Sequence, residues 1–424
     1  MKNRTIKTIT KLLAAGMMLT GCGNNTNVGN TQPATGTVTV YDVDEAAPDK
    51  LPPEAYGDLD ISALKLFNES LQAAPNENVL ISPFSVDVAF GMLENGASDT
   101  TLMEIERVFG DLQVSDMNIA MNSLINRMKN DTNVSWNIAN SIWLNKTGAV
   151  DGEGNSLDGG FTLYDEFCDI LNHNYSAEYY ITPFDENAAH LMNSWVNTNT
   201  NGMIDKIVDG TPQGVAHIMN ALAFEGKWET EFTNVRASDF TNFDGTTSEV
   251  EMLYGSADSY FEIGDGQGFT VPYQGGDYSF VGILPPEEMS LAEFSDSLVK
   301  ENISIGDCIN NAKSGEVSVN FPEFKTEYST DLVQKLHNLG MTEAFSPDAD
   351  FSRLSDAELY VDSVIHKTYI EVTREGTRAA AVTDITTKNA AGPSLRISLD
   401  RPYMYAIIDN ASGLPIFIGA QNMN

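Results

Sequence analysis

Few side chains in this chain of 424 residues have the types and spacing that catalysis requires. None of its five histidines lies in a His-Glu-x-x-His zinc motif, and no Gly-x-Ser-x-Gly nucleophile turn occurs. The histidines are His173, His190, His217, His337 and His366. Because catalysis needs several such groups at matching positions, we expect neither an enzyme nor a cofactor.

One acidic loop has part of the spacing of a calcium-binding loop. Residues 151–158 carry several acids, but the sixth position is Ser156 and not glycine. Thr162 stands where such a loop has a bidentate glutamate. We therefore interpret this segment as a surface insertion without a metal.

The most informative spacing lies near the carboxyl end, in residues 371–387. One side of this stretch carries only uncharged residues: Thr377, Ala379, Ala381, Thr383, Ile385 and Thr387. The other side carries Arg378, Asp384 and Lys388. This alternation predicts a β-strand with one buried and one wet face. The small inward residues, which follow Gly376, suit a strand that enters late between two strands already in place. An ordinary edge strand with a polar face is the alternative.

The amino end has the pattern of an export signal. Residues 1–21 combine four basic residues with the apolar run 12–19, which is too short to span a membrane. The run ends in Leu-Thr-Gly before Cys22, which resembles the cleavage box of bacterial lipoproteins. The resemblance implies cleavage before Cys22, a lipid on its sulfur, and an extracytoplasmic protein anchored to the cell membrane or surface. A plain signal with a chance cysteine is the alternative.

Composition divides the rest of the chain and limits its partners. Residues 22–56 are rich in Asn, Thr, Gly and Pro, which predicts a flexible tether before a domain at 57–424. The net charge of −36 becomes −40 after removal of residues 1–21, which contain four basic and no acidic residues. Such acidity excludes nucleic acid and heparin as partners and favours a soluble monomer.

Cys168 and Cys308 remain besides Cys22. Their spacing suits no metal site, and a disulfide is possible but not needed in a chain with this much core. We expect two buried free thiols.

Periodicity places helices mainly in the front half and strands mainly in the back half, which predicts an α+β domain. Predicted helices include 59–73, one capped by Ser82, one with a capping box at Thr101 and Glu104, one beginning near Trp195, and 331–339. Predicted strands include 134–144, 221–224, 271–273, 279–284, 317–324 and the hairpin 405–409 with 415–419.

Several segments together resemble the serpin family, the loop-inserting inhibitors of serine proteases. They are 78–84 with 96–97, 140–143, 226–228, 271–273 with 284–285, 340–351 and the tail from Arg401. The resemblance covers 57–424. It implies an α+β fold with a large central mixed β-sheet, further sheets, about eight to nine helices and an exposed reactive loop near the C-terminus.

The resemblance also implies a polar cluster under the centre of the large sheet, called the shutter, where two strands part. Its residues correspond to Ser82, Ser85, Asn193 and His366. Such a cluster must hydrogen-bond both the closed and the opened sheet. For His366 alone, a buried structural histidine is the alternative.

The place where insertion begins, called the breach, corresponds to Trp228, Glu323 and Arg374. This chain departs from the family there, because Arg374 occupies the usually acidic position and Glu323 the usually basic one. We predict an ion pair with its charges exchanged. Two unrelated surface charges are the alternative.

The implied hinge and reactive bond lie in the alternating stretch. The hinge residues are Arg374, Glu375, Gly376, Thr377, Arg378, Ala379, Ala380, Ala381, Val382 and Thr383. Counting along the hinge places the cut at Ala390-Ala391, within an uncertainty of one residue. Alanine before the cut suits elastase-like or subtilisin-like proteases, whereas a cut after Lys388 would suit trypsin-like ones.

Two functions follow from the resemblance. The first is a suicide inhibitor that traps a serine protease as an acyl complex, and the small, uncharged hinge residues favour it. Val382 and Arg374 depart from the usual inhibitory pattern. The second is a non-inhibitory carrier or adhesion module that proteases merely cut.

Overall fold

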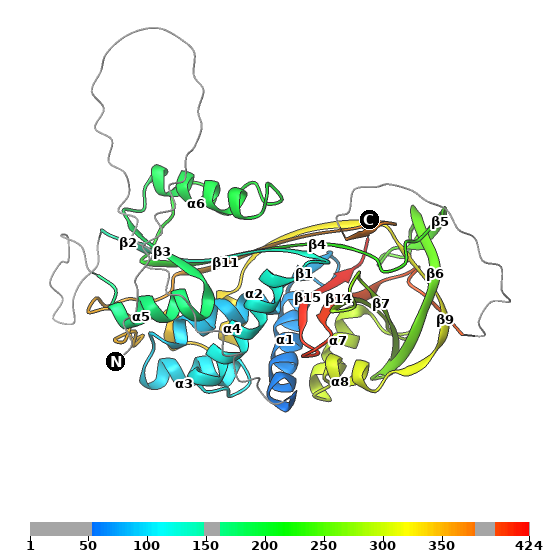
Figure 1. Ribbon diagram of the computed structural model, residues 1–424, viewed down its shortest axis with the longest axis horizontal. Coiled ribbons are helices and arrows are strands. Elements are labelled where there is room, and N and C mark those ends of the chain that lie inside the picture. The colour runs from blue at the N-terminus through cyan, green and yellow to red at the C-terminus, as the bar shows by residue number, and fades with distance from the viewer. Residues whose placement is uncertain (1–52, 148–161, 378–394, 424) are drawn as a thin grey trace, which may run out of the picture.

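The computed structural model describes residues 53–147, 162–377 and 395–423. They form two β-sheets with helices on both sides, so the predicted α+β class is confirmed (Figure 1). One six-stranded mixed sheet runs along the upper side of the molecule in Figure 1. Helix α6 lies above it, and α1 to α5 lie below it.

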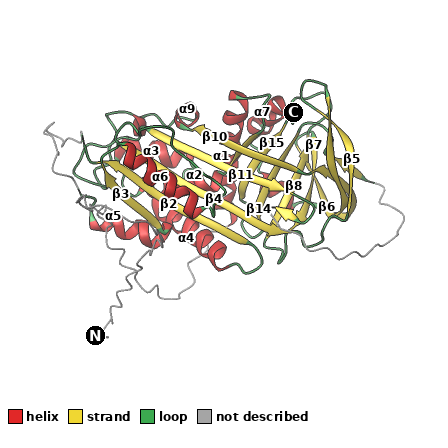
Figure 2. Cartoon of the chain, turned by 90° about the horizontal axis from the view of Figure 1, so that it is seen from above, coloured by secondary structure: helices red, strands yellow, loops and turns green. Residues whose placement is uncertain are grey.

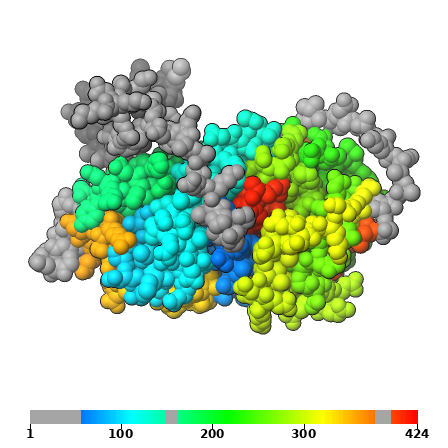
Figure 3. All heavy atoms as spheres, turned by 60° about the horizontal axis from the view of Figure 1, so that its bottom comes forward, coloured from blue at the N-terminus to red at the C-terminus, as the bar shows by residue number. Residues whose placement is uncertain are grey.

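The described helices cluster in the first half of the chain. They are α1 (Pro53–Ala73), α2 (Pro83–Glu94), α3 (Asp99–Val108), α4 (Val114–Asn130), α5 (Asp165–Ile170), α6 (Glu186–Asn199), α7 (Leu291–Lys300), α8 (Ile305–Asn310) and α9 (Val333–Asn338). A π-helical turn η1 (Leu171–Tyr175) and a 3-10 turn η2 (Glu343–Phe345) complete the set. Figure 3 turns the lower side of the molecule toward the viewer. On that side the blue residues of α1 lie between the cyan residues of α3 and α4 and the yellow-green residues of α7 and α8.

The six-stranded sheet has the order β10-β11-β12-β4-β2-β3 (Figure 2). Its strands are β2 (Ser135–Asn145), β3 (Ala177–Thr182), β4 (Ala216–Lys227), β10 (Phe324–Asp331), β11 (Ser363–Val372) and β12 (Gly376–Thr377). Strands β2 and β3 run parallel, as do β4 and β11, whereas β4 and β2 are antiparallel. The sheet is therefore mixed, as the resemblance to the serpin family implies.

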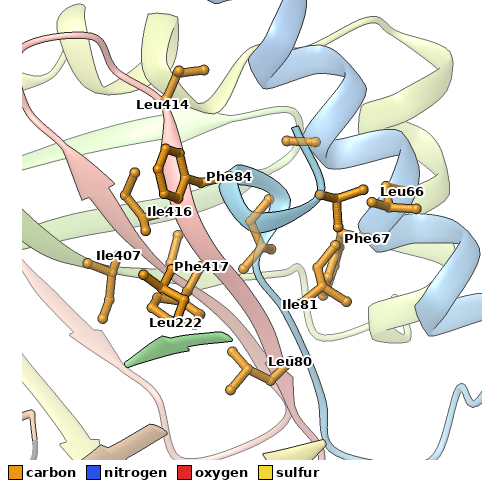
Figure 4. Close-up of a cluster of buried hydrophobic side chains, with 14 of the residues drawn as sticks. Leu66, Phe67, Leu80, Ile81, Phe84, Leu222, Ile407, Leu414, Ile416 and Phe417 are labelled. Atoms are coloured by element: carbon orange, nitrogen blue, oxygen red, sulfur yellow. The ribbon is translucent and has the colours of Figure 1, made fainter. Parts of the chain in front are cut away.

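The second sheet has nine strands. They are β1 (Val79–Ile81), β5 (Asn234–Thr241), β6 (Thr247–Ile263), β7 (Gly266–Pro272), β8 (Tyr278–Leu284), β9 (Lys313–Pro322), β13 (Arg396–Ser398), β14 (Tyr403–Asp409) and β15 (Pro415–Gln421). Side chains of β1, β14 and β15 meet the start of α2 and Leu222 of β4 in one apolar cluster (Figure 4). This cluster joins the two sheets into one core.

The start of α2 follows the predicted local pattern. Ser82 is the N-cap, and its hydroxyl accepts a hydrogen bond from the Ser85 amide at 3.2 Å. Pro83 occupies the first helical position, where its missing N–H leaves no donor unpaired.

The boundaries of three helices differ from the prediction. Helix α1 begins at Pro53, so residues 53–56 are helical and not part of a tether. Helix α6 begins at Glu186, well before Trp195, because Asp185 caps it through the Ala188 amide. The capping box predicted for α3 at Thr101 and Glu104 was wrong, since its N-cap is Ser98, whose side chain makes no capping hydrogen bond among the described residues.

The two residues of that predicted capping box serve a long-range contact. The Thr101 hydroxyl accepts a hydrogen bond from the Asp350 amide at 2.9 Å. The Glu104 carboxylate accepts from the amides of Thr342 and Glu343 at 2.6 and 2.7 Å. These bonds fasten the turn η2 onto α3, and they lower the pKa of Glu104 despite the opposing effect of burial.

Cys168 and Cys308 are free, as expected, but half-buried.

Candidate functional site

The short strand β12 separates two longer strands at one end of the six-stranded sheet. Its Thr377 lies opposite Val372 of β11 on one side and Gly226 of β4 on the other. In the described chain, β4 and β11 pair directly only over His217–Asn220 and Ser363–His366. We call the position of Gly376 and Thr377 between these strands the entry point. It is the place where the alternating stretch of the sequence joins the sheet.

A tight turn of residues 373–376 leads β11 into β12. The Thr373 amide donates to the Gly376 carbonyl at 2.8 Å, and the Thr373 hydroxyl donates to the same oxygen at 3.0 Å. The indole of Trp228 donates to the Thr373 carbonyl at 2.9 Å, and its amide donates to the Glu375 carbonyl at 3.0 Å. These bonds fix the turn against the end of β4.

Gly376 allows the backbones of β12 and β4 to approach closely. Its φ angle is 153°, a conformation that side-chain-bearing residues rarely adopt. A Cβ atom added there would lie 2.1 Å from the Gly226 carbonyl oxygen. A larger residue would therefore push β12 out of the entry point.

The exchanged charges at the entry point form an ion pair. Nε of Arg374 lies 3.0 Å from Oε1 of Glu323, and Nη2 of Arg374 lies 3.4 Å from Oε2 of Glu323. The Arg374 amide also donates to Glu323 Oε1 at 2.9 Å. The hydrogen bond with Glu323 raises the pKa of Arg374, with further support from the Glu323 charge. The pair is partly exposed to solvent, which weakens its attraction, so its main effect is to orient the turn.

The inward side of the entry point is aromatic and dry. Trp228 stacks on Tyr273 at a centroid distance of 4.7 Å, and both are fully buried. The Tyr273 hydroxyl lies 2.6 Å from the Thr377 hydroxyl, and Thr377 is only 1% exposed. Burial raises the pKa of Tyr273 far above its ordinary value, so the phenol is neutral.

A buried polar cluster lies where the direct pairing of β4 and β11 ends. The Ser82 amide donates to His366 Nε2 at 2.9 Å, and the Ser82 hydroxyl donates to the Ile416 carbonyl at 2.8 Å. His366 lies opposite Asn220 of β4 in the parallel ladder. Burial lowers the pKa of His366 to about 4, with a smaller effect of the Lys335 charge, so the imidazole is neutral at pH 7.

A family model described as serpin (serine protease inhibitor) matches residues 60–423. The chain belongs to the serpin family.

Curated relatives and solved structures agree with this assignment. Neuroserpins of Homo sapiens and Gallus gallus are each 30% identical to this serpin over 390 residues, covering 87% of this chain and 90% of theirs. The native state of the thermophilic serpin tengpin matches with a TM-score of 0.81 and 34% identity, covering 89% of this chain and 96% of that one. The latent state of tengpin matches with a TM-score of 0.72 and 36% identity, covering 90% and 98%.

Family membership makes protease inhibition the general function, although some serpins do not inhibit. Among the described residues, no group of three or more His, Cys, Asp or Glu side chains is placed to hold a metal ion. Over the same part of the serpin, no helix is long and apolar enough to cross a membrane.

The polar cluster contains only part of the predicted shutter. Ser82, Ser85 and His366 come together as described, but Asn193 does not join them. Its amide oxygen accepts from the backbone amides of Ile207 and Val208 at 2.8 and 2.9 Å, and its amide nitrogen donates to the Val208 carbonyl. Asn193 therefore fastens the segment after α6.

Sequence reasoning missed the two asparagines that do face each other in the sheet. Asn220 lies opposite His366 on one side and Asn140 of β2 on the other. Its amide nitrogen donates to the Asn140 side-chain oxygen, and the Asn140 amide nitrogen donates to the Tyr175 carbonyl at 2.9 Å. Both residues are buried. The signal that could have identified them was an asparagine within the mainly apolar centre of each strand.

Several predicted residues lie outside the part of the serpin that the structure describes. They are Cys22, the loop 151–158, the hinge residues Arg378, Ala379, Ala380, Ala381, Val382 and Thr383, the alternative cleavage residue Lys388, and the bond Ala390-Ala391. Of the hinge, only Arg374, Glu375, Gly376 and Thr377 are described; the first two lie in the turn before β12, and the last two form the entry point.

Proposed function

We propose that this serpin is a suicide inhibitor that traps an elastase-like or subtilisin-like serine protease as a covalent acyl complex. The observation that carries the proposal is the location of β12, with Gly376 and Thr377 between β4 and β11. The residues that follow, up to Asn389, form the rest of the strand that the proposal requires to enter the sheet.

The proposed reaction is a race between insertion and hydrolysis. The protease serine attacks the carbonyl of Ala390, the peptide bond to Ala391 breaks, and an acyl-enzyme forms. The freed hinge then extends β12 into the sheet and draws the attached protease away from its original position. Displacement of the serine from its oxyanion hole stops deacylation before water can complete it.

The fold supplies the conditions for this race. The short direct pairing between β4 and β11 leaves few backbone hydrogen bonds to break when the strands separate. The next inward residues by sequence alternation, Ala379 and Ala381, are small and uncharged and can enter a core without large rearrangement. The higher TM-score to native than to latent tengpin is consistent with a sheet that has not yet received the loop.

A denaturing gel tests the proposal directly. The protein is mixed with an elastase-like protease and boiled in SDS. We expect a band at the summed mass of the protease and the part of the inhibitor up to Ala390, because the peptide after Ala390 is released, and no such band with protease whose serine has been chemically blocked. A cleaved loop without any adduct would refute the proposal and leave the non-inhibitory function. Mass spectrometry of the released peptide distinguishes cleavage after Ala390 from cleavage after Lys388.

We further propose that the mature serpin is a monomer held outside a bacterial cell by a lipid on Cys22. The lipoprotein-like box before Cys22 and the strong acidity of the chain support this proposal. In detergent phase separation, we expect the full chain to enter the detergent phase and the Cys22→Ser variant to remain in the aqueous phase. Equal partition of both would refute the anchor.

A further inference from the structure

The hydrogen bond between Tyr273 and Thr377 joins the core of the protein to the first inward residue of β12. The two hydroxyl oxygens are 2.6 Å apart, and both residues are at most 1% exposed. Among the contacts of the entry point described above, it is the one made by an inward side chain of β12. The other contacts are made by the turn before it.

Tyr273 is fixed from several sides. Its ring stacks on Trp228 at 4.7 Å and meets the edge of Phe224 at 4.8 Å. Its amide donates to the Tyr278 carbonyl at 3.0 Å, and it forms an isolated β-bridge with Trp228. Its hydroxyl is therefore a fixed reference point under the sheet, against which an entering strand is aligned.

The register of an entering strand has two kinds of error. A shift by one residue would turn Arg378 toward the core, and burial of an unpaired charge opposes that error. A shift by two residues keeps the same face inward and would place Ala379 where Thr377 belongs. The small size of the inward residues does not oppose this second error, because alanine fits where threonine does. The hydrogen bond opposes it, because Ala379 has no hydroxyl to pair with Tyr273.

We propose that Tyr273 is a positioning residue that sets the register of the inserting strand by binding Thr377 before the protease arrives. The inference rests on the proposed inhibitory function. Because Thr377 is already opposite Val372 and Gly226, the bond persists while the strand lengthens. Each residue after Thr377 then pairs with one fixed partner in β4 and in β11, so the register of the inserted strand is unique.

The test compares Tyr273→Phe with Tyr278→Phe. Tyr278 is a matched control, because it is equally buried and its hydroxyl has no hydrogen-bond partner among the residues that the structure describes. For each protein, the moles of inhibitor consumed per mole of protease and the rate of acylation are measured. Tyr273→Phe should raise the consumption about fivefold, the factor that corresponds to one hydrogen bond of roughly 1 kcal/mol, and leave acylation unchanged. Tyr278→Phe should change neither quantity.

A double variant separates register from simple satisfaction of buried hydroxyls. In Tyr273→Phe/Thr377→Val, both hydroxyls of this pair are removed, so neither is left unpaired, but the hydrogen bond that sets the register is also absent. We expect consumption to remain high. Its return to the wild-type value would overturn the inference, as would faster acylation by Tyr273→Phe with unchanged consumption. If the wild type forms no complex at all, the proposed function fails first, and the two failures are thereby distinguished.

Discussion

The strands β14 and β11 lie in the two sheets of the same protein, and they are held in very different ways. All seven residues of β14 are buried, and the strand pairs with β8 on one side and β15 on the other. Strand β11 alternates buried and half-buried residues, and its described ladder with β4 covers Ser363–His366. Beyond that ladder, β12 takes the place beside Val372.

Under the proposed inhibitory function, this difference explains why one sheet changes and the other does not. Separating β14 from its sheet would break two full ladders and expose a continuous apolar strand. Separating β11 from β4 would break one short ladder, at a level where His366 and Asn220 are polar and have partners on other elements. One sheet thus provides a rigid body, and the other provides a place where a strand can enter.

The largest effect on inhibition is expected from a substitution at the entry point, and it tests the proposed difference between the two sheets. Thr377→Arg places an unpaired charge at a position that is 1% exposed, so insertion should fail and the inhibitor should become a substrate. No SDS-stable complex should appear on the gel, whereas Thr377→Ser should retain it. Undiminished inhibition by Thr377→Arg would contradict insertion at this point.

In the rigid body, a core substitution should destabilise the protein before and after cleavage by the same amount. Ile407 of β14 is fully buried, and Ile407→Ala should lower the free energy of unfolding by about 2–5 kcal/mol in both forms. Denaturant melts of intact and loop-cleaved protein measure this. Asn220→Ala should instead change the two forms unequally, because β4 exchanges its neighbour at that level. Equal effects of both substitutions would remove the distinction between the sheets.

The third effect is the pH dependence that His366 gives to the sheet that opens. Burial lowers its pKa in the folded protein to about 4, below the ordinary value of 6.5. Its contribution to stability is therefore present above pH 6.5 and is lost as pH falls toward 4, by about 3 kcal/mol. The difference in stability between wild type and His366→Gln should shrink over that range. Asp60, whose pKa burial raises to about 7, titrates in the opposite direction but cancels in the difference. A difference independent of pH would contradict the prediction.

The smallest effect is expected from the exposed pair Arg374 and Glu323. Its coupling energy should be about 0.5 kcal/mol and should fall with added salt. A cycle of Arg374→Glu, Glu323→Arg and the double variant measures it through the melting temperature. If the double variant does not recover the loss of Arg374→Glu, the side chains orient the turn without attracting each other.

The resemblance to the serpin family predicted the ion pair beside the entry point, and a local pattern predicted the cap of α2. Glu323 and Arg374 were paired correctly because the family pattern aligns both segments directly, and the charge exchange preserves their geometry. The cap at Ser82 was also found, since a serine followed by proline is a local signal. The cap depends on residues that are neighbours in the chain, whereas the ion pair joins two distant segments that the family pattern aligns.

Contacts that depend on long-range register were not predictable in the same way. Asn193 was chosen in place of Asn220, because only the parallel alignment of β4 with β11 shows which asparagine faces His366. Thr101 and Glu104 resembled a capping box, but distant residues 342–350 use both side chains. Tertiary partners replaced the local ones in each case, and a single sequence contains no direct record of them.

Helix α6 crosses the outer face of the sheet, and it adds resistance to any widening. Met192, Trp195 and Val196 form a second core with Met219 and Ala221 of β4, and Ile365 of β11 packs against the same cluster. A strand that inserts between β4 and β11 must therefore also separate Ile365 from the cluster under α6. An antibody fragment that holds α6 against the sheet should therefore slow insertion of the strand. The protease would then cleave the reactive loop without being trapped, although the fragment contacts neither the loop nor the protease.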